Sequence, residues 1–141
     1  MPLPSTASVP GFRILIVEDN PINQKVAGLL LRGAGFEVDL VADGQQALEA
    51  QCSHPYDLIL MDLQMPNVDG FEATRQIRRS QLKQPVIVAL SADVLDDVRE
   101  RCLKVGMDDY LSKPITRDQL LAVVRSVHER LAGADKIRKA N

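Results

Sequence analysis

The sequence predicts an α/β protein in which helices cover both faces of a parallel β-sheet. Five short apolar segments alternate with five segments whose apolar residues recur at helical spacing. Four of the apolar segments lead into polar residues that can handle phosphate, namely Glu18 with Asp19, Asp62, Ser91, and Lys113. Because the carboxyl ends of parallel strands share the sheet edge where such folds bind ligands, the same pattern predicts a site.

The first strand covers residues 14–17 and leads into the first helix. Asn20 can cap this helix, with Pro21 at its first position. Gly33 and Gly35 end it. In between, apolar side chains recur at helical spacing at Ile22, Val26, Leu29 and Leu30. This helix therefore starts at the predicted site.

The second strand is predicted at an edge of the sheet and the third at its centre. Residues 37–41 alternate between polar and apolar, which is typical of a strand exposed on one side. Asp43 and Gly44 then lead into a short helix over residues 45–52. Residues 58–61 are uniformly apolar, so we expect a strand that is buried on both faces.

A loop over residues 65–70 follows Asp62, and a third helix follows the loop over residues 71–80. This helix carries Ile77 inward. Three arginines point outward, and we interpret them as a solvated face rather than a binding patch: Arg75, Arg78 and Arg79.

The last two strands and helices complete the alternation. A strand over residues 86–90 precedes a helix over residues 95–105, and Gly106 stands where a left-handed cap is expected. A short strand at residues 110–111 precedes a capping box at residues 116–119, which opens the fifth helix. Side chains predicted to face inward are Val98, Cys102 and Val105 of the fourth helix and Leu120, Leu121, Val124, Val127 and Leu131 of the fifth.

Length and composition fit one globular domain. The 141 residues are 45% hydrophobic, and we place the domain at residues 12–132. Residues 1–11 are predicted to be disordered, and residues 133–141 to form a charged tail or linker. The formal net charge of -2 offers no footprint for nucleic acid or an anionic membrane. No apolar run approaches the ~18 residues of a membrane span, so we expect a cytoplasmic chain without membrane contact.

The cysteines and histidines do not suggest a metal site. Cys52 and Cys102 lack the paired spacing of a zinc or redox motif, so we interpret both as small buried hydrophobic residues. His54 and His128 lie away from the strand ends, and we interpret both as surface residues rather than ligands.

Three carboxylates are predicted to lie together at the ends of two neighbouring strands. Glu18, Asp19 and Asp62 would repel one another by roughly 4 kcal/mol per close pair at an effective dielectric near 20. A divalent cation removes this repulsion, and ligands that are all oxygen suit Mg²⁺ better than zinc.

With Mg²⁺ and Lys113 added, the charges of this site sum to zero. Such a site can accept a dianionic phosphoryl group without presenting a negative field. Aspartate can act as a nucleophile toward phosphorus and form an acyl phosphate while a metal and a lysine neutralise the transferring oxygens. Asp62 is the predicted nucleophile.

The sequence resembles the receiver domain of two-component response regulators over residues 13–131. Four segments carry the resemblance: ILIVEDNPINQK at 14–25, MDLQMPNVDGFEA at 61–73, ALSA at 89–92 and GMDDYLSKP at 106–114. Together they are highly specific for that family.

The resemblance implies a role for each site residue. Asp62 is the phosphoacceptor, and Lys113 and Ser91 contact the phosphoryl group. Mg²⁺ is bound directly by Asp19, Asp62 and the backbone carbonyl of Gln64, and through water by Glu18. Ser91 stands where threonine is commoner in the family, so its hydroxyl is kept while a methyl group is lost.

The resemblance also implies a fold and a switch. The fold is a flavodoxin-like, doubly wound sheet of five parallel strands in the order 2-1-3-4-5, with a cis peptide bond before Pro114. Phosphorylation would pull Ser91 inward and let Tyr110 fill the vacated space. The surface that changes is then formed by the fourth helix, the fifth strand and the fifth helix.

The segments at 14–25 and 61–73 are most similar to receivers of hybrid sensor histidine kinases. The implied partners are a histidine kinase or a histidine phosphotransfer domain, which would dock through the first helix and the loops around Asp62. We expect a monomer or weak dimer that is not a stand-alone enzyme but assists its own phosphorylation and dephosphorylation. In a hybrid kinase the chain would be the cytoplasmic part of a membrane-anchored sensor.

Three other functions share part of this pattern. A degenerate receiver would act as an interaction module without phosphorylation, although every expected active-site side chain is present. A phosphatase of the haloacid dehalogenase type needs a second aspartate two positions after the first, where this sequence has Gln64. A dinucleotide-binding fold needs a glycine-rich first turn, where this sequence has Glu-Asp-Asn-Pro.

Overall fold

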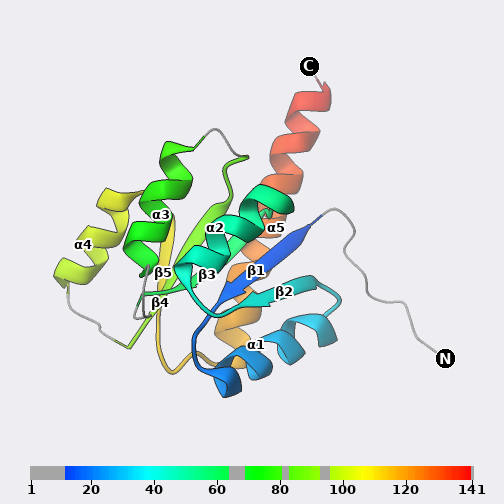
Figure 1. Cartoon of the computed structure of the whole chain (residues 1–141). Helices are drawn as coiled ribbons and strands as arrows, with labels where there is room; N and C mark the ends of the chain where they lie inside the picture. The colour runs from blue at the N-terminus through cyan, green and yellow to red at the C-terminus, as the bar shows by residue number, and fades with distance from the viewer. Residues whose placement is uncertain (1–11, 64–68, 81–82, 93–95, 141) are drawn as a thin grey trace.

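The computed structural model confirms the predicted α/β architecture. It describes residues 12–63, 69–80, 83–92 and 96–140. Strands and helices alternate along these residues (Figure 1), in the order β1 (Arg13–Val17), α1 (Pro21–Gly33), β2 (Glu37–Val41), α2 (Gly44–Ser53), β3 (Leu58–Asp62), α3 (Gly70–Arg79), β4 (Val86–Ser91), α4 (Asp96–Val105), β5 (Asp109–Ser112) and α5 (Arg117–Ala140).

The strands form one parallel sheet in the order β2-β1-β3-β4-β5, as predicted. The central strand β3 is buried at every position, whereas the edge strands β2 and β5 each have exposed residues. This difference explains why the sequence of β3 is uniformly apolar and that of β2 alternates.

The core has two parts, one on each face of the sheet, because successive strand residues point to opposite faces. Alternate residues of β1, such as Ile14 and Ile16, pack with α1 and α5. The intervening residues, Leu15 and Val17, pack with α2, α3 and α4. The helices therefore cover both faces, as Figure 1 shows.

The predicted helix boundaries are confirmed where capping chemistry defines them. The Asn20 side chain accepts hydrogen bonds from the backbone N–H groups of Ile22 and Asn23 at 2.9 and 3.1 Å. At α5, the Thr116 and Gln119 side chains each accept a bond from the other's backbone N–H, both at 3.1 Å. Gly106, with φ of +105°, ends α4 in the left-handed region.

Of the four residues in the predicted apolar stripe of α1, only Leu30 packs against the core. Ile22, Val26 and Leu29 are 73%, 51% and 60% exposed. The side of α1 that faces the sheet is offset from this stripe and includes Gly28, where an added Cβ would be in van der Waals contact with the Leu40 side chain at 3.4 Å. Leu31 is buried on the side that faces the sheet, whereas Ile22, Val26 and Leu29 form an exposed apolar surface.

The interpretation of both cysteines as buried is correct for Cys102 and wrong for Cys52. Cys52 is exposed on α2, and the neighbouring Gln51 is buried in its place. The Gln51 amide donates to the Lys83 carbonyl at 2.9 Å and accepts from the Tyr56 backbone N–H at 3.0 Å. Because its hydrogen bonds are satisfied, this polar side chain can occupy the inward position.

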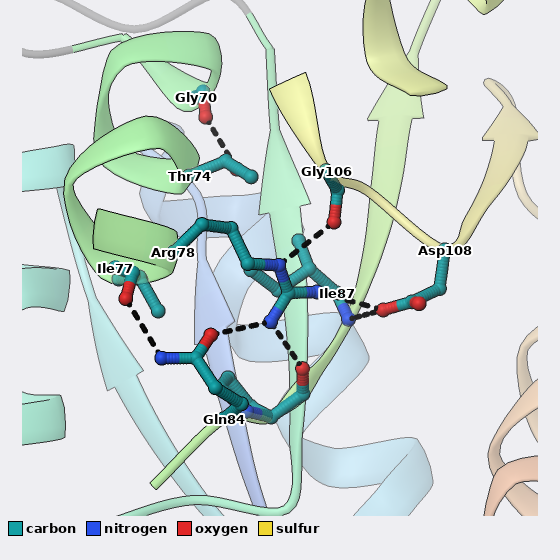
Figure 2. Close-up of polar contacts among 9 residues, drawn as sticks. Gly70, Thr74, Ile77, Arg78, Gln84, Ile87, Gly106 and Asp108 are labelled. Carbon is teal, nitrogen blue, oxygen red and sulfur yellow. Dashed lines mark hydrogen bonds and ion pairs between the residues drawn. The ribbon is translucent and has the colours of Figure 1, made fainter. Parts of the chain in front are cut away.

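The interpretation of the α3 arginines as a solvated face is wrong for Arg78. Figure 2 shows its guanidinium directed at the turn between α4 and β5 and at the segment before β4. It donates to the carbonyls of Gly106 and Pro85 at 2.8 Å and to the side chains of Gln84 and Asp108 at 2.9 Å. Its side chain is only 23% exposed. Arg78 thus joins three segments of the fold.

The two ends of the chain differ in what the structure describes. Helix α5 continues to Ala140, so residues 133–140 of the predicted charged tail or linker are helical. His128 of α5 is half-buried, with its ring centroid 5.0 Å from that of Phe12. Residues 1–11 lie outside the described residues, as does most of the predicted loop at 65–70.

Among the described helices, none combines the length and apolar character needed to cross a bilayer.

Candidate functional site

The three predicted carboxylates meet at the carboxyl edge of the sheet. Glu18 and Asp19 directly follow β1, and Asp62 is the last residue of the adjacent strand β3. Carboxylate oxygens of the three residues lie within 4.8 Å of one another. Glu18 and Asp62 are each only 4% exposed, whereas Asp19 is open to solvent. The parallel topology thus concentrates negative charge at one place.

Lys113 brings the predicted positive charge into this cluster. Its Nζ lies 3.0 Å from Glu18 Oε2 and 3.3 Å from Asp62 Oδ2. The Lys113 backbone N–H donates to the Ser91 carbonyl at 2.7 Å, and the peptide bond to Pro114 is cis, as predicted. Burial lowers the pKa of the ammonium, but the hydrogen bond to Glu18 and the charge of Asp62 outweigh that effect and raise the pKa. Lys113 is therefore positively charged at neutral pH.

Both oxygens of Glu18 already have hydrogen-bond donors. Oε2 accepts from Lys113, and Oε1 accepts from the Asn20 backbone N–H at 3.1 Å. The orientation of the Glu18 carboxylate is therefore fixed from both of its oxygens.

Ser91 and Tyr110 lie on neighbouring strands at the same side of the site. Ser91 ends β4 and is buried, and Leu90 before it is paired with Asp62. Tyr110 of β5 is paired with Ala89 and packs against the core cluster of α2, α3 and α4. Its hydroxyl is buried and has no hydrogen-bond partner among the described residues. The ring is therefore turned inward.

Gly70 is a site residue that the sequence reasoning did not single out. It is the first residue of α3, after the capping residue Asp69. A Cβ at this position would lie 2.5 Å from the Asp62 carbonyl oxygen, so only glycine lets α3 approach the end of β3 this closely. The available signal was the Asp-Gly pair before a helical segment.

The donor set fits a magnesium ion. The cluster contributes only oxygen ligands, and the exposure of Asp19 leaves room for the several waters that Mg²⁺ retains. Gln64, whose carbonyl was predicted as a further ligand, lies outside the described residues. The cluster can therefore hold a hard divalent cation.

An apolar cavity of about 490 Å³ adjoins the acidic cluster. Helix α1, the strand ends and the segment after Lys113 line it, and Glu18 and Lys113 form its polar end. The apolar lining includes Val26, Ala27, Leu30, Pro114 and Ile115. The cavity joins the exposed surface of α1 to the site.

Comparisons with known proteins agree with this arrangement. The hybrid signal transduction histidine kinase B of Dictyostelium discoideum is 42% identical over 126 residues, which cover 80% of this chain and 6% of that protein. Across eight curated relatives, the chain spans 5–14% of their length. It therefore corresponds to a small part of those proteins.

Two solved structures are similar over nearly their whole length. The receiver domain of a Pseudomonas aeruginosa sensor histidine kinase, with magnesium coordinated in its active-site cleft, is 46% identical with a TM-score of 0.76, covering 82% of this chain and 96% of that one. The receiver domain of a Saccharomyces cerevisiae response regulator, crystallised with a histidine phosphotransfer signalling protein, is 35% identical with a TM-score of 0.73, covering 85% and 88%.

A family model described as the response regulator receiver domain matches residues 14–125. That range contains the acidic cluster, Ser91 and Lys113. It also contains all five strands, apart from Arg13 at the start of β1. The chain belongs to the family of response regulator receiver domains, and its relatives include hybrid histidine kinases.

Proposed function

We propose that Asp62 is the phosphoacceptor of this receiver and takes its phosphoryl group from a phosphohistidine. The single observation that carries the proposal is the position of the Asp62 carboxylate, which is buried at a strand end within 3.3 Å of Lys113 and 4.8 Å of two further carboxylates. Such a carboxylate is aligned by its surroundings and has a cation ready to balance incoming charge.

The proposed transfer is an in-line displacement. An oxygen of Asp62 attacks phosphorus, so that a new O–P bond forms as the P–N bond to the partner's imidazole breaks. The electron pair of the broken bond stays on the imidazole nitrogen, which takes up a proton from solvent water. Lys113 contacts the oxygens of the transferring group and offsets their charge, and Ser91 donates a hydrogen bond to one of them.

The residues that would hold Mg²⁺ are Asp19 and Asp62 directly, Gln64 through its carbonyl, and Glu18 through water. When bound, Mg²⁺ would neutralise charge on the phosphoryl oxygens and help to hold the group with its phosphorus facing Asp62. The hydrogen bonds that occupy both Glu18 oxygens support its outer position. Lys113 and the cation would together offset the negative charge of the three carboxylates.

Phosphorylation would change the surface around α4, β5 and α5. The Tyr110 ring already packs inward in this structure, so the change we propose is in how the buried ring packs beside Ser91, not in bringing the ring in from solvent. The conformational change is a population shift biased by the new charge and its hydrogen bonds.

The partner is a histidine phosphotransfer domain or histidine kinase that docks on α1. Two observations support this surface: the exposed apolar side chains of α1, and the cavity that continues from Val26 to Lys113. Exposed apolar patches of this kind mark protein interfaces. Since relatives include hybrid kinases, we place this domain within such a kinase, where the histidine that supplies the phosphoryl group is on a separate domain.

Phosphorylation of the purified chain by acetyl phosphate tests the proposal. With Mg²⁺ present, intact mass spectrometry should show the gain of one phosphoryl group. Asp62→Asn should abolish the gain, since an amide oxygen is a far weaker nucleophile. Asp118→Asn, on the exposed first turn of α5, is the matched control and should retain it. A chain that gains no mass with any donor would instead be an interaction module that works without phosphorylation.

A further inference from the structure

Gln24 of α1 contacts the backbone that carries the acidic residues, although it is not part of the cluster. Its side-chain amide donates to the Val41 carbonyl at 3.0 Å and to the Glu18 carbonyl at 3.3 Å. We infer that Gln24 is a positioning residue that holds the metal-binding carboxylates in place and couples the docking surface of α1 to the metal site. This inference rests on the proposed function.

The contacts of Gln24 lie where the regular pairing of β1 with β2 ends. That pairing runs as far as Val17 and Val41. One residue later, the Glu18 backbone N–H donates to the Val41 carbonyl at 3.1 Å. Gln24 donates to the same carbonyl, so a side chain of α1 continues the ladder at the point where the strands separate.

The second contact fixes the peptide unit between the two acidic residues. The Glu18 carbonyl belongs to the peptide bond that joins Glu18 to Asp19, so its orientation sets the directions in which both side chains leave the backbone. The Glu18 side chain is separately held by Asn20 and Lys113. Among the described contacts, Gln24 supplies the hydrogen bond to this carbonyl. Loss of its donors would free the peptide unit to rotate.

The same residue connects the metal site to the surface of α1. Ile22 and Val26, two positions before and after Gln24, are exposed on the proposed docking surface. Asn20, which caps α1, also donates its backbone N–H to Glu18. A partner that displaces the first turns of α1 would therefore move the donors of Glu18 at the same time. Partner binding and Mg²⁺ binding are coupled through these hydrogen bonds, and the coupling is reciprocal.

Magnesium titrations of Gln24→Met test the inference. Methionine keeps the length of the side chain but has no N–H donors. We expect the Mg²⁺ concentration at half-saturation, measured by calorimetry, to rise about tenfold, the lower end of the effect of outer-shell partners on metal affinity. At saturating Mg²⁺, the rate of phosphorylation by acetyl phosphate should return to within about twofold of the unmodified chain, because only the binding step is weakened.

Gln45→Met is the matched control, because Gln45 is an exposed glutamine at the start of α2. It should leave the half-saturation point unchanged. A second measurement needs no variant: on adding Mg²⁺, the side-chain amide signals of Gln24 in nitrogen-proton spectra should shift with the same half-saturation, and those of Gln45 should not.

The outcomes separate this inference from the proposed function. If the unmodified chain neither binds Mg²⁺ nor becomes phosphorylated, the proposed function fails. If it does both, but Gln24→Met binds Mg²⁺ with unchanged half-saturation or the Gln24 amide signals do not move, the positioning role is wrong. A rate at saturating Mg²⁺ that stays low in Gln24→Met would likewise overturn it, because a general distortion would then be the cause.

Discussion

The two edges of the β-sheet differ in how their carboxylates are paired with cations. Toward the amino edge, three carboxylates each have a cation of their own: Asp57 lies 2.6 Å from Lys83, Asp108 lies 2.9 Å from Arg78, and Asp39, in the middle of β2, lies 3.5 Å from Arg13. At the carboxyl edge, three carboxylates lie together, and one cation, Lys113, contacts two of them, Glu18 and Asp62. Balanced pairs hold segments together, whereas an excess of buried negative charge needs a further cation and so forms a site.

The comparison predicts that removing the cation at the carboxyl edge impairs chemistry. Lys113→Met takes away the positive charge that faces both Glu18 and Asp62. We expect phosphorylation by acetyl phosphate at saturating Mg²⁺ to slow about a hundredfold, the effect of removing one donor aimed at developing charge.

Rates of phosphoryl gain measured by mass spectrometry would check this expectation. Lys104→Met, an exposed lysine in the last turn of α4, is the control and should react at the normal rate. A normal rate in Lys113→Met would mean that the metal alone balances the charge, and the contrast between the two edges would lose its functional meaning.

Removing a cation at the amino edge should instead reduce stability. Arg78→Met removes four hydrogen bonds and leaves Asp108 without its ion pair. We expect the free energy of unfolding to fall by about 2 kcal/mol, since the group is only partly buried and some of the loss is recovered by water. Urea unfolding measures this change.

Arg79→Met provides the comparison on the same helix, because Arg79 is exposed. It should alter the unfolding free energy little, and Mg²⁺ binding should be normal in both variants. If Arg78→Met reduced the free energy of Mg²⁺ binding by as much as it reduced the free energy of unfolding, the two edges of the sheet would not be independent.

The features that the sequence predicted are those set by neighbours in the chain. Strand ends, the Asn20 cap, the capping box at Thr116 and the turn at Gly106 depend on local chemistry, and the structure places them as expected. The meeting of Asp62 with Lys113 was also predictable, because parallel strands must end at one edge.

The features that the sequence did not predict depend on which side of a helix meets the sheet. The α1 stripe of Ile22, Val26 and Leu29 has the spacing of a buried face, but periodicity alone cannot distinguish the sheet from a partner protein as its contact. The contacts of Gln24 and Arg78 were likewise missed, since both Gln24 acceptors and two of the four Arg78 acceptors are backbone carbonyls, which have no signature in the sequence.

The smallest effect concerns the amino edge at high pH. The Tyr56 hydroxyl donates to Asp39 Oδ2 at 2.6 Å, and the Arg13 guanidinium carbon lies 5.0 Å from the ring centroid. Burial, together with the hydrogen bond to Asp39 and its charge, raises the pKa of Tyr56 from 10.0 to about 12, although Arg13 acts in the opposite direction. The folded protein therefore keeps this proton at a pH where the unfolded chain has lost it.

This difference determines the sign of the pH dependence. Below pH 10 both states are protonated at Tyr56, and the full stabilisation is present; it is lost as the pH rises from 10 toward 12. Between about pH 9 and about pH 11, the unfolding free energy should fall by about 1 kcal/mol from this group alone. Tyr56→Phe should remove that part of the slope, while Tyr110→Phe should keep it. The measurement is the unfolding free energy from urea unfolding as a function of pH. If its slope were the same in Tyr56→Phe and in the unmodified chain, the surroundings of Tyr56 would not hold its proton. The ion pair and hydrogen bond at Asp39 would then be weaker than their distances indicate.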